Sequence, residues 1–340
     1  MILISAAGSG GTNRLVENCK EKFLGVTADK YKLFCSILKI NILTPHANDE
    51  VNYIKKINEI ITTYKVTLFI PNSDLEVHVV SKNINKIKTK TFIPNFDLVD
   101  LTFDKWSFHQ KLKELNIASA HTFNIKDNTD ITTAFEELKQ APLWCRTRSG
   151  SGSKHTSKVM SVSDATSYIE HCCAVYNLPK SEFLISEYLA GEDIAVMTIW
   201  KNGEIKMCKM AKRVRYSGEA GESAPNVIES FYDKNVEEFV IDSISKLNLK
   251  PNGILNVDIK CYKDATLAIT EINAGRFYYN MQLFNYGKVN ALECFLNVAN
   301  NKDNEFLFDD PEIIFIREQD NQPSIITKKE FNNIDTIKAS

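Results

Sequence analysis

The segment GILNVDIKCYKDATLAITEIN, residues 253–273, constrains the fold more than any other part of the chain. Two apolar, strand-like runs flank a short polar turn, which predicts an antiparallel hairpin. With a two-residue turn, Asp258 lies opposite Glu271 and Asn256 lies opposite Asn273. Because side chains alternate along a strand, these four polar side chains then share one face of the hairpin.

The other face of this hairpin is apolar and packed. A turn at residues 264–265 places Val257, Ile259 and Cys261 against Ile272, Thr270 and Ala268. Two carboxylates directly opposite each other repel unless a cation lies between them, and oxygen ligands of this kind suit Mg²⁺. The pair Asp258 and Glu271 therefore predicts a metal site. The alternative is a different register with a solvated polar face, since Lys-Asp-Ala-Thr is not a strong turn sequence.

A second segment, PLWCRTRSGSGSK at residues 142–154, has the composition of a phosphate-binding loop. A strand delivers Arg146, and a loop of small residues with a second cation, Arg148, follows it. Small side chains leave backbone N–H groups free for phosphate oxygens, and arginine forks bind oxygen pairs. The spacing does not match GxxxxGK[ST], so this is no Walker motif. A serine-rich surface turn is the alternative interpretation.

A third segment, FLISEYLAGED at residues 183–193, is an apolar strand that runs into a short acidic turn. Its backbone could hydrogen-bond a nucleotide base, and Glu192 could bind a ribose. Taken alone, an ordinary solvated turn explains the same residues.

Arginine is rare in this chain, with seven arginines among 41 basic residues. Lysine supplies surface charge equally well, so arginine marks positions where a rigid bidentate fork matters. Five of the seven lie in three short segments, at Arg146, Arg148, Arg213, Arg215 and Arg276. Arg14 and Arg317 receive no role. The net charge of −2 argues against a nucleic-acid partner.

The eight cysteines show no CxxC spacing and lie mostly in apolar runs, which predicts reduced, buried thiols. No run approaches about 18 apolar residues, and the amino terminus lacks a basic segment before its apolar run. We therefore expect a cytoplasmic protein that does not bind membranes. The six scattered histidines argue against a zinc site.

Residues 1 to about 100 alternate strand-like runs with helical patterns, which predicts a parallel α/β unit closed by Pro94 and a polar stretch before Asp104. Strands are expected at 2–6, 23–28 and 66–70, and helices at 12–22, 48–64 and 75–83. Beyond Asp104 the pattern mixes helices with hairpins, the first turning at residues 201–203 and followed by a long loop at 217–226. A last strand is expected at 312–317.

In this order, these segments resemble the ATP-grasp superfamily, particularly its carbamoyl-phosphate-synthase-like carboxylate-amine ligases. The resemblance covers about residues 1–300 and implies an α/β and α+β protein, in which two α+β subdomains grip ATP behind a Rossmann-like pre-ATP-grasp domain. The implied domains are residues 1–100 for the pre-ATP-grasp domain, 101–310 for the ATP-grasp domain and 311–340 for a C-terminal tail.

The resemblance also implies roles for individual residues. Lys105, Arg146 and Arg148 would bind the nucleotide phosphates beneath a cover that contains Ser151, Gly152 and Ser153. Tyr188 and Leu189 would hold adenine through their backbone, beside Glu187 for the amino group and Glu192 for the ribose. Asp258, Glu271 and Asn273 would bind Mg²⁺, or Mn²⁺ in its place, with Asn256 beside them as a catalytic residue.

One departure concerns the arginine after these metal ligands. The usual Glu-x-Asn-Pro-Arg run is Glu271-Ile272-Asn273-Ala274-Gly275-Arg276 here, so Arg276 is displaced by one residue. It remains the candidate catalytic residue for the acceptor carboxylate or an acyl phosphate, together with Arg146. Arg213, Arg215 and the loop 217–226, with Glu219 and Glu222, lie where relatives admit the second substrate, although Arg213 and Arg215 also fit an exposed strand.

The implied function is an ATP- and Mg²⁺-dependent ligase that activates a carboxylate as an acyl phosphate for attack by an amine. The implied partners are a small carboxylate and an amine, such as an amino acid or peptide, and a second copy of the chain in a homodimer.

Two other functions remain open. Gly8, Gly10 and Gly11 with Asp29 approach a dinucleotide fingerprint, but Asn13 stands where a third glycine is needed, so an NAD(P)-dependent oxidoreductase is one alternative. A non-catalytic ATP-binding protein is the other. The acidic pair argues against it, because opposed carboxylates without a cation are costly.

Overall fold

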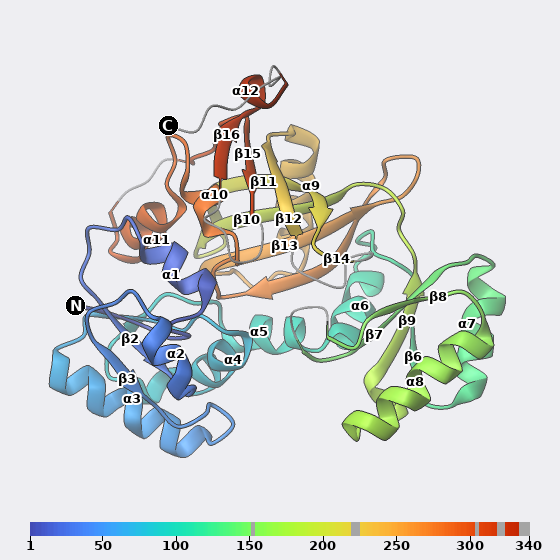
Figure 1. The fold of residues 1–340 in the computed structure, drawn as a ribbon, viewed down its shortest axis with the longest axis horizontal. Helices are drawn as coiled ribbons and strands as arrows, with labels where there is room; N and C mark the ends of the chain where they lie inside the picture. The colour runs from blue at the N-terminus through green and yellow to red at the C-terminus, as the bar shows by residue number, and fades with distance from the viewer. Residues whose placement is uncertain (151–153, 219–224, 303–305, 318–323, 333–340) are drawn as a thin grey trace.

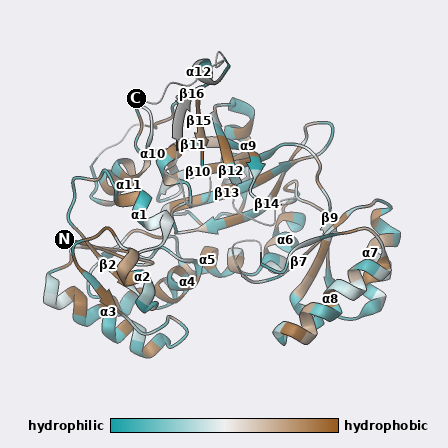
Figure 2. Cartoon of the chain, viewed as in Figure 1, coloured by the Kyte–Doolittle hydropathy of each residue, from teal (hydrophilic) through white to brown (hydrophobic). Residues whose placement is uncertain are grey.

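The computed structural model describes residues 1–150, 154–218, 225–302, 306–317 and 324–332. The described residues form three sheets of five, seven and four strands. Figure 1 shows the N-terminal sheet and the four-stranded sheet as separate lobes, with the seven-stranded sheet above and between them. Hydrophobic residues follow the strands of all three sheets (Figure 2).

The N-terminal sheet is parallel, with the strand order β3-β2-β1-β4-β5. Its strands are β1 (Ile2–Ile4), β2 (Phe23–Thr27), β3 (Asn41–Leu43), β4 (Leu68–Ile70) and β5 (Lys90–Thr91). The helices between them are α1 (Gly10–Val16), α2 (Lys30–Cys35), α3 (Glu50–Tyr64) and α4 (Asp74–Lys82). The predicted parallel α/β unit is confirmed. The predicted helix at 12–22 is shorter in the structure, and α2, β3 and β5 were not predicted.

The stretch before Asp104, which we expected to be a polar linker, is a helix. α5 (Phe96–Phe103) begins at an Asn95 cap and buries Leu98, Val99 and Thr102. α6 (Lys105–Glu114) follows directly, capped by the Asp104 side chain. The domain boundary expected at residue 100 therefore falls inside a helix that packs on the seven-stranded sheet through contacts with β14.

The four-stranded sheet is antiparallel, in the order β6-β9-β7-β8. It consists of β6 (Thr122–Ile125), β7 (Leu143–Thr147), β8 (Ser157–Val159) and β9 (Phe183–Glu187). α7 (Asn128–Leu138) and α8 (Val162–Tyr176) pack against it through Ile131, Ala134, Ala165 and Ile169.

The seven-stranded sheet has the order β14-β13-β10-β11-β12-β15-β16 and is antiparallel throughout. Its strands are β10 (Asp193–Lys201), β11 (Glu204–Tyr216), β12 (Pro225–Phe231), β13 (Gly253–Cys261), β14 (Leu267–Ala274), β15 (Ile313–Ile316) and β16 (Ser324–Thr327). α9 (Lys234–Lys246), α10 (Met281–Asn285) and α11 (Ala291–Ala299) accompany it, and α12 (Lys328–Asn332) follows β16.

Two features of this sheet bear on the sequence analysis. Residues 202 and 203 turn with φ of 54° and 86°, as a tight hairpin requires, so the first hairpin is confirmed. The segment 311–340, expected to be a separate tail, supplies β15 and β16 to the same sheet. Among the described residues, no helix is long and apolar enough to span a bilayer.

Candidate active site

The hairpin that carries the acidic pair has a longer turn than expected. Tyr262 N donates to Thr266 O at 2.9 Å and Ala265 N donates to Tyr262 O at 3.0 Å, so residues 263–265 form the loop. Ala265 takes a positive φ of 66° there. The predicted two-residue turn is wrong, and without a further change every downstream pairing would shift by one residue.

A β-bulge restores the predicted pairing. Ile259 pairs with Ile269 while its neighbour Asp258 pairs with Glu271, so Thr270 is an extra residue in β14. Beyond the bulge, Asp258 faces Glu271 and Asn256 faces Asn273. On the packed side, Val257 faces Ile272 as expected, but two expected pairs are wrong: Ile259 faces Ile269 rather than Thr270, and Cys261 faces Leu267 rather than Ala268.

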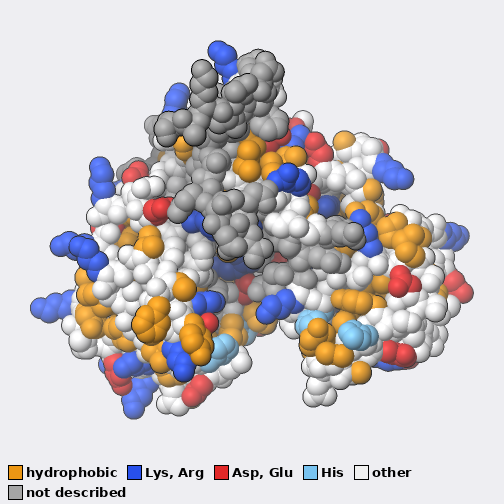
Figure 3. All heavy atoms as spheres, in the orientation of Figure 1, with side chains coloured by type: hydrophobic (Ala, Val, Ile, Leu, Met, Phe, Trp, Pro, Cys, Tyr) orange, Lys and Arg blue, Asp and Glu red, His pale blue; other side chains and the backbone are white. Residues whose placement is uncertain are grey.

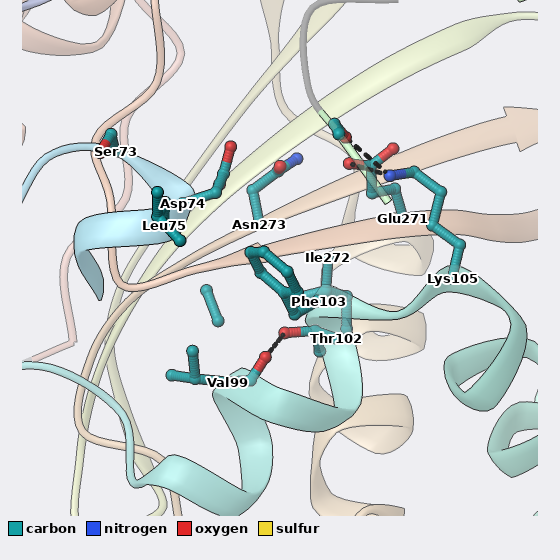
Figure 4. Close-up of a pocket in the computed structure, with 12 residues that line it drawn as sticks. Ser73, Asp74, Leu75, Val99, Thr102, Phe103, Lys105, Glu271, Ile272 and Asn273 are labelled. Carbon is teal, nitrogen blue, oxygen red and sulfur yellow. Dashed lines mark hydrogen bonds and ion pairs between the residues drawn. The ribbon is translucent and has the colours of Figure 1, made fainter. Parts of the chain in front are cut away.

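Two buried cations point at Glu271. Lys105 Nζ lies 3.6 Å from Oε1 and Arg146 Nη1 lies 3.6 Å from Oε2. Lys105 is the first residue of α6, and it also donates to Gly150 O at 3.0 Å (Figure 4). Arg146 projects from β7. The structure thus brings together three predicted site residues from three separate segments.

Arg146 is held in place by its other nitrogen. Nη2 donates to His109 Nε2 at 2.9 Å and to the backbone oxygen of Thr270, the bulge residue, at 3.0 Å. Burial, together with the positive charges of Arg146 and Lys105, lowers the pKa of His109 to about 3. His109 is therefore neutral at physiological pH and accepts a hydrogen bond from Arg146, while Nη1 remains directed at Glu271.

The two carboxylates of the acidic pair differ in their environment. Burial raises the pKa of Glu271, but the positive charges of Lys105, Arg146 and Arg276 lower it by more. The pKa of Glu271 therefore lies below its usual value. Burial raises the pKa of Asp258, and the nearby charges of Glu271 and Asp193 add to this effect against the opposing Arg213. Glu271 is the more firmly ionised of the two.

Arg213, expected at a substrate entrance, lies against Asp258 instead. Its Nη2 is 2.5 Å from Asp258 Oδ1, and its Nη1 is 2.8 Å from Asp193 Oδ1. Tyr278 accepts from Arg213 Nε at 2.8 Å, and Lys260 lies 2.9 Å from Asp193 Oδ2. The sequence analysis missed Asp193 and Tyr278 because their proximity depends on strand order.

The displaced Arg276 returns to the acidic face. Its Nη2 donates to Asn273 Oδ1 at 2.6 Å, and its Nε bonds Asp74 at the start of α4. Asn256 Nδ2 donates to the Arg276 backbone oxygen at 2.7 Å. The extra residue before the arginine therefore leaves its side chain in contact with a predicted metal ligand.

The donor set fits a hard cation. Asp258, Glu271 and Asn273 offer oxygen atoms on one face of the hairpin, and Asn256 Oδ1 is buried there without a hydrogen-bond partner among the described residues. Asp258 Oδ2 has only a 3.5 Å contact with the Asn273 amide. No group of three or more His, Cys, Asp or Glu side chains suited to a metal occurs in the described residues, so the amide oxygens have to complete such a site.

The expected base-binding segment lies at the end of β9. Glu187 Oε2 accepts from His121 N and from Tyr262 OH, both at 2.8 Å. The Tyr188 ring lies beneath Lys158, at 4.6 Å from Nζ to the ring centroid, and Leu189 is buried. Glu192 is exposed and lies 2.6 Å from Lys212 Nζ. The carboxylate of Glu187 thus anchors this segment to two others.

Arg148, expected to bind the nucleotide phosphates, pairs with an acidic residue of the chain. It lies 2.9 Å from Asp104, the cap of α6, and the structure does not place it against Glu271. This pair ties the end of β7 to the helix that carries Lys105. Ser151, Gly152 and Ser153, and likewise Glu219 and Glu222, lie outside the described residues.

A cavity of about 220 Å³ adjoins the acidic face. One wall is β14, with Glu271 and Asn273, and the other comes from Ser73 and Asp74 in α4 and from Phe103 in α5 (Figure 4). Figure 3 shows the molecular surface hollowed between the N-terminal lobe and the lobe of the four-stranded sheet, with Lys and Arg side chains along the hollow.

The sequence of this chain matches a known protein family. The sequence profile of the ATP-grasp domain matches residues 102–277, just over half of the chain. The chain belongs to the ATP-grasp family. Across 205 residues it is 25% identical to the carbamoyl phosphate synthase large chain of Caldanaerobacter subterraneus subsp. tengcongensis. That match covers 57% of this chain and 18% of the relative, so the chain spans less than a fifth of the length of that protein.

Solved ATP-grasp structures show the same fold. Biotin carboxylase from Campylobacter jejuni superposes with a TM-score of 0.69 at 14% identity, covering 93% of this chain and 75% of that one. The MgADP-bound biotin carboxylase domain of the Hydrogenobacter thermophilus 2-oxoglutarate carboxylase gives 0.73 at 11%, with coverage of 93% and 74%. L-amino acid ligase from Bacillus licheniformis gives 0.67 at 11%, with coverage of 92% and 78%.

Proposed function

We propose that this ATP-grasp protein is an ATP- and Mg²⁺-dependent ligase, which activates a carboxylate as an acyl phosphate that an amine then attacks. The observation that carries the proposal is the convergence of Lys105 and Arg146 on Glu271, across a hairpin face that also presents Asp258 and Asn273. Cations beside oxygen ligands are what phosphoryl transfer from ATP requires.

We assign each group of residues a role from its position in the site. Lys105 Nζ and Arg146 Nη1 would bind the phosphate oxygens of ATP and stabilise the charge that develops during transfer. Asp258, Glu271 and Asn273 would hold Mg²⁺, or Mn²⁺ in its place. When bound there, the metal would neutralise charge on the phosphate groups during transfer. The backbone of Tyr188 and Leu189 would hold adenine, with Glu192 near the ribose.

The acceptor would occupy the cavity between β14 and the α4–α5 segment. Arg276 contacts two residues that line this cavity, Asn273 and Asp74, and its guanidinium would bind the carboxylate that is to be phosphorylated. Attack by an amine on the resulting acyl phosphate forms the amide and releases phosphate. We propose amino acids or peptides as the carboxylate and amine. We also propose a cytoplasmic homodimer.

The test is ADP release measured over a panel of carboxylates and amines with Glu271→Gln beside the wild type. We expect ADP release by the wild type with at least one carboxylate and amine pair, and its loss in the variant by a factor of about 100 or more, because the substitution removes a metal-ligand charge. Glu137→Gln, an exposed position on α7, is the matched control.

Two outcomes would count against the proposal. ATP binding without ADP release over the whole panel would favour a non-catalytic ATP-binding protein. Wild-type turnover by Glu271→Gln would reject the assignment of the site.

A further inference from the structure

Two arginines without a role in the proposed reaction meet at one exposed tyrosine. Arg14 of α1 and Arg317, directly after β15, lie over the ring of Tyr279, with their guanidinium carbons 5.5 Å and 4.7 Å from its centroid. Tyr279 is 41% exposed. These three residues come from the N-terminal unit, from the loop after β14 and from the C-terminal strands.

This positive cluster has no acidic partner. In the part of the chain that the structure describes, no carboxylate lies within ion-pair distance of Arg14 or Arg317, whereas Arg146, Arg148, Arg213 and Arg276 all have one. Nη1 of Arg14 is buried and has no well-directed hydrogen-bond acceptor among the described residues. Two guanidinium groups beside the same tyrosine and without a carboxylate partner are suited to an oxyanion from outside the chain.

The N-terminal glycines explain how the cluster can form. A Cβ at Gly10 would lie 3.0 Å from the Tyr279 hydroxyl and 3.1 Å from Arg14 Nη1, and one at Gly11 would lie 3.4 Å from the Tyr279 ring. The glycines therefore allow α1 to approach Tyr279 closely. Two of the glycines of the incomplete dinucleotide fingerprint, Gly10 and Gly11, are accounted for by this contact.

The cluster is fixed relative to the active site. Asn72 accepts a hydrogen bond from Phe277 N at 2.9 Å and donates one to Thr12 at 3.0 Å, so it ties the loop after β14 to α1. Along that loop, Arg276 contacts Asn273, Tyr278 contacts Arg213, and Tyr279 reaches the cluster. Three residues of chain span at most roughly 11 Å, so a small metabolite can reach from Arg276 to Tyr279.

We propose that Arg14, Arg317 and Tyr279 form a binding site for an oxyanion, a carboxylate or phosphate group that the acceptor substrate carries away from its reacting end. The identification of the ligand as the acceptor rests on the proposed ligase function, whereas oxyanion binding itself does not. The site would select acceptors with a second anionic group over otherwise similar acceptors without one.

Tyr279 supplies a local reporter of binding. Partial burial raises the pKa of Tyr279, but hydrogen bonding from Arg14 and the charge of Arg317 outweigh this effect and lower it. An oxyanion between the arginines would compete for them and repel the phenolate, which raises the pKa of Tyr279. The phenolate absorbance is measured against pH for the wild type and for Tyr279→Phe. The difference between the two curves reports the ionisation of Tyr279 alone.

The binding experiment uses inorganic phosphate and succinate as probes of the two anion types. We expect at least one of them to raise the pKa of Tyr279 in the wild type and in Lys113→Gln, a charge-removal control at an exposed position of α6. The same probe should not shift it in Arg14→Gln or Arg317→Gln. No shift with either probe, or an equal shift in the arginine variants, would overturn the proposal.

The acceptor experiment compares ADP release with matched acceptors that carry a distal carboxylate, a distal phosphate or no distal charge. Arg14→Gln and Arg317→Gln should raise KM at least about tenfold for the charged acceptor, leave kcat unchanged and leave the uncharged acceptor unaffected. Equal losses for all three acceptors would reject selection by this site. If no acceptor supports ADP release, the proposed ligase function fails while the Tyr279 titration still decides oxyanion binding.

Discussion

Arg146 is oriented by a neutral histidine rather than by an acid. His109 lies one helical turn from Lys105 on α6, so the two side chains face the same way and meet Arg146 and Glu271 together. Burial disfavours a charged histidine here, and the charge would also repel both cations, so the pKa of His109 is low. His109 follows Lys105 by four residues in the sequence, and this helical spacing could have identified His109 as a site residue.

The role of His109 can be tested by changing its ability to accept a hydrogen bond. His109→Leu removes the acceptor, and hydrogen bonds to charged groups contribute about 1.5–3 kcal/mol, so kcat/KM for ATP should fall about 10- to 100-fold. His109→Gln, which retains an acceptor oxygen, should recover part of the loss. Steady-state kinetics of ADP release would measure both.

The pH profile gives an independent check on the same residue. The pKa of His109 is about 3, so His109 should not titrate near pH 6.5. The pH profiles of kcat/KM for the wild type and for His109→Gln should therefore have the same shape around pH 6.5. An inflection there in the wild type alone would show that His109 titrates during turnover and would contradict the neutral assignment.

Glu76 is a buried acid in the N-terminal unit. It accepts hydrogen bonds from Ser5 and Ser73, both at 2.6 Å, and from Tyr53 at 3.1 Å. Burial raises the pKa of Glu76 despite these lowering bonds. A carboxyl with a raised folded-state pKa stabilises the fold most below its unfolded pKa of about 4.3, and this contribution is lost as the pH rises through the folded pKa.

We therefore expect Glu76→Gln to alter how stability depends on pH. The free energy of unfolding of the wild type minus that of the variant should decrease between about pH 4 and about pH 7, because only the wild type must bury an ionised carboxylate at the higher pH. Urea unfolding at several pH values measures this difference, with Glu137→Gln as the exposed control. A difference that rises with pH would contradict the buried assignment.

At the scale of elements, the β13–β14 hairpin shows how a correct pairing can come from a wrong turn. The sequence predicts Asp258 opposite Glu271 from an assumed two-residue turn, and the structure contains that pair. The loop has one more residue than expected, and the bulge at Thr270 offsets it. A bulge carries no composition signal in a short apolar strand, so neither of the two compensating features could be predicted separately.

Deleting Thr270 should preserve the pairing of the two strands and remove one contact of Arg146. The deletion removes the extra residue, so Asp258 can still face Glu271 in a regular ladder, but the backbone oxygen that accepts from Arg146 is lost. We expect a folded protein whose ADP release falls at least about tenfold.

The matched control for this deletion is removal of Asp264. It shortens the loop to two residues and leaves the bulge in place, so ADP release should be retained. Circular dichroism and thermal unfolding would establish that both variants fold. Equal activity of the two deletion variants would show that the Thr270 oxygen does not matter to the site.

Periodicity predicted the long elements and failed for short ones. α3 has a buried apolar stripe, and the sequence predicts it at residues 48–64. α2 buries no residue, so no apolar pattern marks it. The approach of Arg213 to Asp258 depends on the order β13-β10-β11, in which Ala195 pairs with both Asp258 and Ala211. Strand order is a property of the whole sheet and is not contained in any local segment.

At the scale of the whole molecule, one buried ion pair ties the C-terminal half together. Lys209 of β11 lies 2.9 Å from Asp309 and donates to the backbone oxygens of Tyr286 and Val289, both at 2.7 Å. Asp309 also accepts from Lys288 N at 2.7 Å. The pair therefore joins the centre of the large sheet to the segments on both sides of α11.

Breaking this pair should destabilise the molecule strongly. Lys209→Met leaves the carboxylate of Asp309 without its cation, and the removal of one partner from a buried pair costs about 3–5 kcal/mol. Denaturant unfolding should show this loss, whereas Lys206→Met, on the same strand with an exposed acidic partner, should change stability by less than about 1 kcal/mol. Equal effects of the two substitutions would contradict the argument.

The cavity beside the acidic face also bears on how proteins of this design can diversify. Its wall opposite Glu271 and Asn273 comes from two short segments, residues 73–75 and residues 99–103, whereas Arg146 and the carboxylates stand on strands of the other two sheets. Substitutions at Leu75, Val99 or Phe103 can thus reshape this cavity without replacing Lys105, Arg146 or the carboxylates. If the cavity holds the acceptor, as we propose, part of the acceptor selectivity can change in these two segments while the residues proposed for activation stay the same.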